Sequence, residues 1–340
     1  MGSKKYMGGR KGAMGHQTIL KLYEMMFLIR SVEERLKQEY PSRNIRMPVH
    51  LSIGQEAIAA GVLLAARKSD CCISTHRCHA HYLAKGGDLT EMIDELYSLD
   101  TGCSRGRGGS MHLFDKKCNM WGSGAIVTGG IPIATGMTLA LKQQGTDDIC
   151  IGFTGDGGIE EGAFYESLNL AALLNLPVLF VVENNGYSVI TPQAKRQASL
   201  DVVAKACSFG LKGVSIDGND VLKVYETTSQ IIDGMRRNSQ PFLMEAVTYR
   251  LCAHVGPGSD FDGGGRPEAE LFAWMEKDPI CMLKVKIQNE YSSLVPRCAQ
   301  IEKQVLESIN TAFERAKARF AVRNAEAGLA APKPPDPSRV

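Results

Sequence analysis

Asp156 and Asn185 are the residues whose types and surroundings point most directly to chemistry. Asp156 is flanked by Gly155, Gly157 and Gly158, and Asn185 follows 29 positions later (185 − 156). Mg²⁺ prefers oxygen ligands in octahedral geometry and takes few of them from protein, the rest from water and phosphate. Glycine lets the backbone approach such a ligand closely. Either motif alone is also typical of an ordinary turn, but together they favour a magnesium and diphosphate site.

The elements that must position this pair are two strands and a helix. Two apolar runs of strand length, 149–153 and 178–182, end shortly before Asp156 and Asn185. A helical pattern begins at Glu160 between them, with acidic residues in its first turn. Strand, helix and strand in so short a span predict a right-handed parallel crossover, which brings the carboxyl ends of both strands to the same edge of a sheet. We expect both side chains to meet at that edge.

Two other phosphate-binding motifs do not fit the sequence. A dinucleotide fingerprint that starts at Gly155 requires glycine at position 160, where the chain has Glu160. The P-loop pattern GxxxxGK[ST] does not occur anywhere. Nicotinamide cofactors and nucleoside triphosphates are therefore disfavoured.

With this spacing, the segment resembles the thiamine-diphosphate-dependent 2-oxo acid dehydrogenases, specifically the alpha subunit of the decarboxylating component. The likeness runs from about Leu20 to Asp278. It implies an α/β fold with a doubly wound, mostly parallel sheet and a helical C-terminal extension. It also implies that Asp156 and Asn185 give side-chain oxygens to Mg²⁺ and that Tyr187 gives its backbone carbonyl. The glycines implied to bind the cofactor are Gly155, Gly157 and Gly158.

Four further stretches match this family in the family's order along the chain. They are 50–57, 74–86, 106–112 with the following 125–127, and 249–254. His112, in the third stretch, has no role that we can assign. Each histidine or arginine in these stretches is, by itself, more often structural than functional, and their shared order is what favours the family.

The matched stretches imply roles for individual residues. The residues implied near the substrate or the reacting centre are His50, His79 and His254, the last of them in a mobile loop that also contacts the cofactor. Arg77 is implied to bind the diphosphate, and Val127, with Ala125 beside it, to hold the cofactor bent between its two rings. His76 stands where the family usually has tyrosine, a variant that resembles the acetoin dehydrogenase branch, and we expect it to bind the cofactor.

Cysteine and histidine crowd into residues 71–81, which invites a zinc interpretation. The adjacent cysteines do not form a CxxC pair, and no second pair follows at the spacing of a structural zinc site. Zinc is therefore disfavoured there. The ten cysteines have no regular spacing, which predicts free thiols in a reducing compartment and favours a cytoplasmic location.

Charge and hydropathy exclude some partners. Lys and Arg number 39 against 37 Asp and Glu, so the formal net charge is only +2. No basic stripe follows the first dozen residues, and nucleic acid is therefore disfavoured as a partner. No apolar run of membrane-spanning length and no signal-peptide pattern occurs, so we expect no membrane association.

The pattern predicts three regions. Residues 1–17 form a flexible basic N-terminus, 18–325 form a single α/β domain with C-terminal helices, and 326–340 form a proline-rich extended tail. Apolar residues recur at helical spacing over 301–320, and we expect this helix to cover the core rather than another subunit.

The expected function is decarboxylation of a 2-oxo acid such as pyruvate, or cleavage of acetoin, with transfer of the acyl unit to a lipoyl carrier. The cofactors implied are thiamine diphosphate and Mg²⁺. No second α/β half is visible to supply the activating glutamate, so the resemblance implies a beta subunit in an α2β2 heterotetramer, and a lipoyl acyltransferase core is a further candidate partner. Two alternatives stay open. One is a biosynthetic transferase that passes the two-carbon or acyl unit to a sugar or carrier-bound acceptor. The other is a non-catalytic subunit that binds the cofactor.

Overall fold

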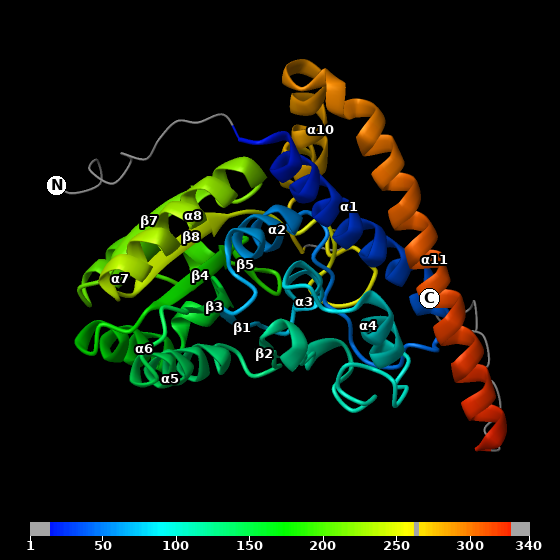
Figure 1. The fold of residues 1–340 in the computed structure, drawn as a ribbon, viewed down its shortest axis with the longest axis horizontal. Helices are drawn as coiled ribbons and strands as arrows, with labels where there is room; N and C mark the ends of the chain where they lie inside the picture. The colour runs from blue at the N-terminus through cyan, green and yellow to red at the C-terminus, as the bar shows by residue number, and fades with distance from the viewer. Residues whose placement is uncertain (1–13, 262–264, 328–340) are drawn as a thin grey trace.

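The computed structural model describes residues 14–261 and 265–327, and their centre is a six-stranded parallel sheet (Figure 1). The strand order is β2-β1-β3-β4-β8-β7, and every neighbouring pair is parallel. A short antiparallel hairpin, β5 with β6, follows β4. The strands are β1 Cys71–Ile73, β2 Met120–Gly122, β3 Cys150–Gly155, β4 Val178–Asn184, β5 Tyr187–Ser188, β6 Thr191–Pro192, β7 Lys212–Asp217 and β8 Phe242–Val247.

Helices cover both faces of the sheet, as Figure 1 shows. Because side chains alternate along a strand, Phe153 and Val181 pack on the face of α2 and α8, and Phe180 and Val182 pack on the face of α5, α6 and α7. This confirms the doubly wound α/β fold. The helices are α1 His16–Glu39, α2 Glu56–Ala65, α3 His79–Ala84, α4 Leu89–Leu96, α5 Gly130–Gln143, α6 Gly162–Leu173, α7 Val202–Cys207, α8 Val221–Asn238, α9 Glu268–Met275, α10 Pro279–Glu290 and α11 Val295–Glu326.

The crossover predicted around Asp156 is present. β3 pairs with β4 in parallel, and α6 connects them. The helix begins later than the sequence pattern indicated, because a 3-10 turn at Gly158–Glu160 comes first and Glu161 is extended. This turn separates the glycines at the end of β3 from the helix proper.

The C-terminal helix α11 lies along α1 at one side of the molecule (Figure 1). Its apolar residues, Ile301, Val305, Ile309 and Phe313 among them, are buried in the core cluster that also contains α1. Arg35 of α1 also forms an ion pair with Glu314. The apolar face of this helix therefore covers the core of the chain.

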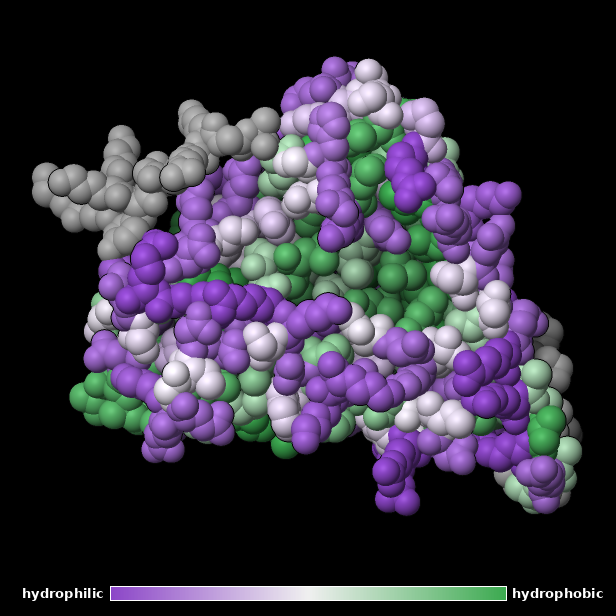
Figure 2. Space-filling view, viewed as in Figure 1, coloured by the Kyte–Doolittle hydropathy of each residue, from purple (hydrophilic) through white to green (hydrophobic). Residues whose placement is uncertain are grey.

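The predicted flexible N-terminus and proline-rich tail lie almost entirely outside the described residues. None of the helices within the described ranges is long and apolar enough to span a lipid bilayer. All ten cysteines lie inside those ranges and are free thiols. On the face drawn in Figure 2, hydrophilic side chains cover most of the surface, and hydrophobic ones gather in its hollowed centre and at its lower left edge.

Candidate active site

A cavity opens at the carboxyl edge of the sheet, where β3 and β4 end. Parallel strands place the groups that follow them along one edge, so residues distant in sequence converge there. Nearly all the sequence-predicted site residues line this cavity. They are His50, His76, Arg77, Ala125, Val127, Gly155, Asp156, Gly157, Gly158, Asn185, Tyr187 and His254.

Asp156 follows β3 directly and its side chain is buried, with 1% of the residue exposed. Its Oδ2 forms an ion pair with Arg196, whose guanidinium also pairs with Glu160. Burial raises the pKa of the Asp156 carboxyl, and Arg196 opposes that shift. Arg196 itself is not among the residues that line the cavity, so it supports the carboxylate from behind.

Asn185 follows β4 and is held by two hydrogen bonds. Its Nδ2 donates to Oε1 of Gln55 at 3.0 Å, and its Oδ1 accepts from the backbone N–H of Tyr187 at 3.2 Å. Gln55 is buried and also lines the cavity. These contacts fix the orientation of the amide beside the carboxylate of Asp156.

The glycine run after β3 has little room for side chains. A Cβ on Gly158 would lie far inside contact distance of the hydroxyls of Thr154 and Thr128, and one on Gly157 would lie 3.0 Å from Oγ of Ser188. Thr128 Oγ1 also donates to the carbonyl of Gly158 at 2.5 Å. A carboxylate, an amide and a narrow glycine cradle at one wall of the cavity form a donor set that fits Mg²⁺ and a diphosphate.

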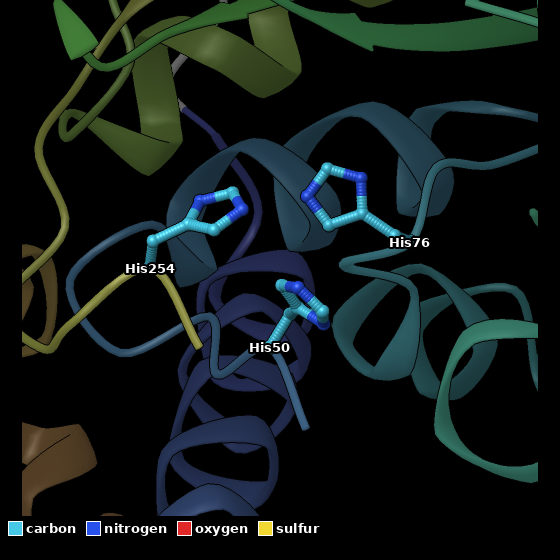
Figure 3. Close-up of side chains that lie close together, drawn as sticks. All are labelled: His50, His76 and His254. Atoms are coloured by element: carbon cyan, nitrogen blue, oxygen red, sulfur yellow. The ribbon is translucent and has the colours of Figure 1, made fainter. Parts of the chain in front are cut away.

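Three histidines from separate segments converge at the same cavity (Figure 3). His50 precedes α2, His76 follows β1, and His254 lies in the loop after β8. The ring centroids of His50 and His76 are 4.6 Å apart, those of His50 and His254 are 5.1 Å apart, and those of His76 and His254 are 5.4 Å apart. We call these three residues the histidine trio.

Burial and nearby cations keep the histidine trio neutral. Burial, followed by the neighbouring His76 and Arg77, lowers the pKa of His50 to about 2. Burial and then Arg77 lower the pKa of His76 to about 3 and that of His254 to about 4. At neutral pH the three imidazoles are therefore uncharged.

Arg77 is the fixed positive charge beside the histidine trio. It is 5% exposed and donates to the carbonyls of Leu51 and His254, the latter at 3.4 Å. Burial, followed by Arg250, lowers the pKa of Arg77 to about 10, so its guanidinium stays charged at neutral pH. A buried cation that faces a cavity is suited to binding an anion.

His79 is the one predicted site residue that the structure does not bring to the cavity. It begins α3, is fully buried, and does not line the cavity. Its Nδ1 lies 3.3 Å from Oε2 of Glu33, and its Nε2 lies 2.9 Å from Oγ of Ser110. These two contacts hold its ring in the core of the chain.

Ala125 and Val127 lie on the loop before α5 and are exposed at the cavity wall. Half of the Val127 residue surface is accessible, and the neighbouring Ile126 is 81% exposed. Apolar side chains exposed together at a cavity mouth are typical of a surface that a ligand or another subunit covers.

Several residues that line or support the cavity were not predicted from the sequence as site residues. Gln55 was within a matched stretch, and Glu183 directly follows the apolar run 178–182 while still in β4, which was a usable signal. Glu183 Oε1 lies 3.3 Å from Nε2 of the buried His81. Thr128 and Arg196 gave no local signal, since their roles depend on contacts that only the fold creates.

The chain is similar to known proteins along most of its length. The dehydrogenase E1 component family matches residues 24–323. The chain is 37% identical to pyruvate dehydrogenase E1 component subunit alpha of Rickettsia bellii over 87% of this chain and 90% of that protein. It is 38% identical to the chloroplastic subunit alpha-3 of Arabidopsis thaliana, over 88% and 71% of the two chains. It is also 36% identical to the alpha subunit of acetoin:2,6-dichlorophenolindophenol oxidoreductase of Bacillus subtilis, over 88% and 89%.

The family match spans all the residues that line the cavity, includes β3 and β4, and extends into α11. The chain therefore belongs to the dehydrogenase E1 component family, in its branch of alpha subunits of thiamine-diphosphate-dependent 2-oxo acid dehydrogenases.

Proposed function

We propose that this chain, with a beta subunit, decarboxylates a 2-oxo acid such as pyruvate, or cleaves acetoin, and passes the acyl unit to a lipoyl-type acceptor. The observation that carries the proposal is the cavity itself. Asp156 and Asn185, at the ends of adjacent parallel strands, share it with Arg77 and the histidine trio. Relatives named for pyruvate and for acetoin both match the chain along most of its length.

Asp156, Asn185 and Tyr187 are the residues we assign to Mg²⁺. The carboxylate and the amide would each give a side-chain oxygen, and Tyr187 its backbone carbonyl. Arg77 and the backbone of Gly157 and Gly158 would bind the diphosphate, because a buried guanidinium and a glycine cradle suit that anion. Water and phosphate oxygens would complete the metal's octahedron.

When bound, thiamine diphosphate supplies the carbon nucleophile that adds to the substrate carbonyl and takes up the electrons released with carbon dioxide. Val127 and Ala125 would support the bent cofactor from the cavity wall. His50 and His254, neutral at pH 7, would donate hydrogen bonds to the substrate carboxylate and to the developing oxyanion. His79 would hold the Ser110 segment beneath them.

A beta subunit is needed on chemical and structural grounds. The activating glutamate of thiamine enzymes has no candidate in this cavity except Glu183, which is next to His81 at the end of β4. Ile126, Val127 and Ile133 are all at least half exposed beside the cavity, and an apolar partner surface would bury them. We further expect the complex to work in the cytoplasm or another reducing compartment, where ten free thiols persist.

The test is reduction of dichlorophenolindophenol by the chain with its beta subunit, Mg²⁺ and thiamine diphosphate. Pyruvate, branched 2-oxo acids and acetoin are offered separately. We expect one donor class to support reduction and D156N to abolish it. D233N, at an exposed aspartate on α8, is the matched control and should keep the wild-type rate.

Two results would overturn the proposal. Absence of dye reduction with every donor, although cofactor binds, would indicate a transferase that needs a sugar or carrier-bound acceptor. A D156N variant that assembles poorly yet keeps full turnover per assembled particle would indicate that the cofactor is structural.

A further inference from the structure

We propose that His50, His76 and His254 form a binding site for a zinc-type transition-metal ion, separate in chemistry from the magnesium site. The histidine trio is the one group of three potential metal ligands of the His, Cys, Asp and Glu types that gathers this closely among the described residues. The metal site stands independently of the proposed function. Only the inhibition of the enzyme by a bound ion rests on that function.

The histidine nitrogens need to move only a short distance to share one metal ion. One ligand nitrogen of each histidine lies within 4.8 Å of the others. Zinc–nitrogen bonds of about 2 Å in a tetrahedral site put neighbouring nitrogens about 3.4 Å apart and ring centroids about 5 Å apart. The observed centroid distances of 4.6, 5.1 and 5.4 Å already match the second value. Small ring rotations would therefore bring the nitrogens onto one ion.

The ring orientations also favour a shared ligand. The planes of His50 and His76 meet at 70°, those of His50 and His254 at 80°, and those of His76 and His254 at 56°. Rings that stack face to face would point their nitrogens past one another, whereas these three turn toward a common centre, as Figure 3 shows.

An unpartnered nitrogen gives an independent reason for a ligand. His50 is 8% exposed, and its Nδ1 is buried with no hydrogen-bond partner in the described part of the chain. A buried polar atom left without a partner costs free energy, and such atoms are uncommon in folded proteins. A metal ion bound through this nitrogen would supply the missing partner.

The electrostatics select the kind of ion. Burial lowers the pKa of all three histidines, so they are already in the neutral form that binds metals. Three imidazoles suit Zn²⁺, Co²⁺ or Cu²⁺ and not Mg²⁺, which needs oxygen ligands. Arg77 and Arg250 repel a dication, so an anionic ligand at the open fourth position would strengthen binding.

The consequence for the proposed function is inhibition. His50 and His254 are assigned to the substrate, and a bound Zn²⁺ would take their nitrogens. The apparent KM for the donor should therefore rise with zinc concentration, and added Mg²⁺ should not reverse the effect, because the two ions prefer different ligands.

The binding test uses the metal-free, full-length chain with Co²⁺ as the probe and Mg²⁺ in excess. We expect one equivalent of cobalt to give the visible absorption of a four- or five-coordinate ion. H76Q and H254Q should each weaken this binding by about ten-fold or more. The matched control is H16Q, at an exposed histidine on α1. D156N tests whether cobalt binds at the magnesium site instead. Both variants should keep the wild-type cobalt spectrum.

Each outcome decides the proposal. Thermal unfolding of every variant identifies one that has failed to fold, and the second histidine variant then carries the test. A wild-type chain that shows only hydrated cobalt, or H76Q and H254Q variants that both bind like wild type, would overturn the site. Cobalt binding without dye reduction would overturn the proposed function alone. Full activity at zinc concentrations that saturate the site would overturn the inhibition.

Discussion

Arg196 forms an ion pair with Asp156 from outside the cavity that Asp156 lines. The same guanidinium pairs with Glu160 and donates to the carbonyl of Thr191 at 3.0 Å. One buried carboxylate oxygen is thus occupied, which fixes the plane of the carboxylate and leaves the other oxygen for the cavity. Groups behind a metal ligand commonly orient it in this way.

Replacing Arg196 with glutamine should weaken Mg²⁺ binding. Burial already raises the pKa of Asp156, and loss of the guanidinium would raise it further, so protons would compete more strongly with Mg²⁺ for the carboxylate. We expect the apparent Mg²⁺ dissociation constant to rise about ten-fold or more at pH 6.5, because loss of a group that orients a metal ligand typically costs about that much affinity. The effect should shrink toward pH 8.5. Fluorescence quenching by thiamine diphosphate during a Mg²⁺ titration measures it.

R237Q, at an exposed arginine on α8, is the control for this substitution and should bind Mg²⁺ like wild type. Tighter Mg²⁺ binding by R196Q would contradict the prediction, since it would mean that Arg196 competes with the metal for Asp156.

Gly158→Ala should damage the cofactor cradle. The added Cβ would clash with the hydroxyls of Thr154 and Thr128, which would have to move. We expect a stability loss of about 1–3 kcal/mol from overpacking and a thiamine diphosphate dissociation constant at least about ten-fold higher. Calorimetric titration and urea unfolding check the two effects.

Gly136→Ala is the matched control, because Gly136 lies inside α5 and a Cβ there meets nothing within 4 Å. It should stabilise the chain by about 0.5–1 kcal/mol through better helix propensity. Equal cofactor affinity in the two variants would show that the cradle tolerates a methyl group.

The strand–helix–strand unit around Asp156 could be predicted because its signals are local. Buried parallel strands appear as continuous apolar runs, and the motif at each strand end fixes where the polar groups emerge. Both strands extend beyond the predicted runs, to Gly155 and Asn184, because polar residues continue the ladder to the cavity edge. The parallel crossover then placed Asp156 and Asn185 together without any further information.

The support around the site could not be predicted in the same way. The contact between Arg196 and Asp156 joins residues 40 positions apart, and the trio contact between His50 and His254 joins residues 204 positions apart. Neither contact leaves a periodic pattern in the sequence. His79 shares a matched stretch with His76 and Arg77, yet the start of α3 turns its side chain into the core. Only the fold decides that direction.

Replacing His79 with alanine should therefore reduce stability more than it reduces chemistry. The change leaves the buried Glu33 carboxylate and the Ser110 hydroxyl without this partner. We expect a loss of about 2–4 kcal/mol in the free energy of unfolding, measured with urea. H112A, at an exposed histidine, should change it by less than about 0.5 kcal/mol. Unchanged stability together with lost turnover would indicate that His79 acts at the reacting centre.

The metal-free chain should become less stable as the pH drops below about 6.5. The histidine trio has folded-state pKa values lowered to about 2, 3 and 4, whereas in the unfolded chain each imidazole takes up a proton near its ordinary value. Between pH 6.5 and 4 the unfolded state therefore binds more protons, so stability is full above this window and decreases as the pH falls through it.

H254Q removes one of these proton-binding groups, so the free energy of unfolding should depend less steeply on pH. We expect its free energy of unfolding to vary less steeply than wild type, by up to about 1 kcal/mol per pH unit between pH 6.5 and 4.5. Urea unfolding at half-unit pH intervals measures both slopes, and H16Q should keep the wild-type slope. If H254Q and wild type have the same slope, the imidazole of His254 is protonated in the folded chain, and it would then face the substrate as a cation rather than as a neutral donor.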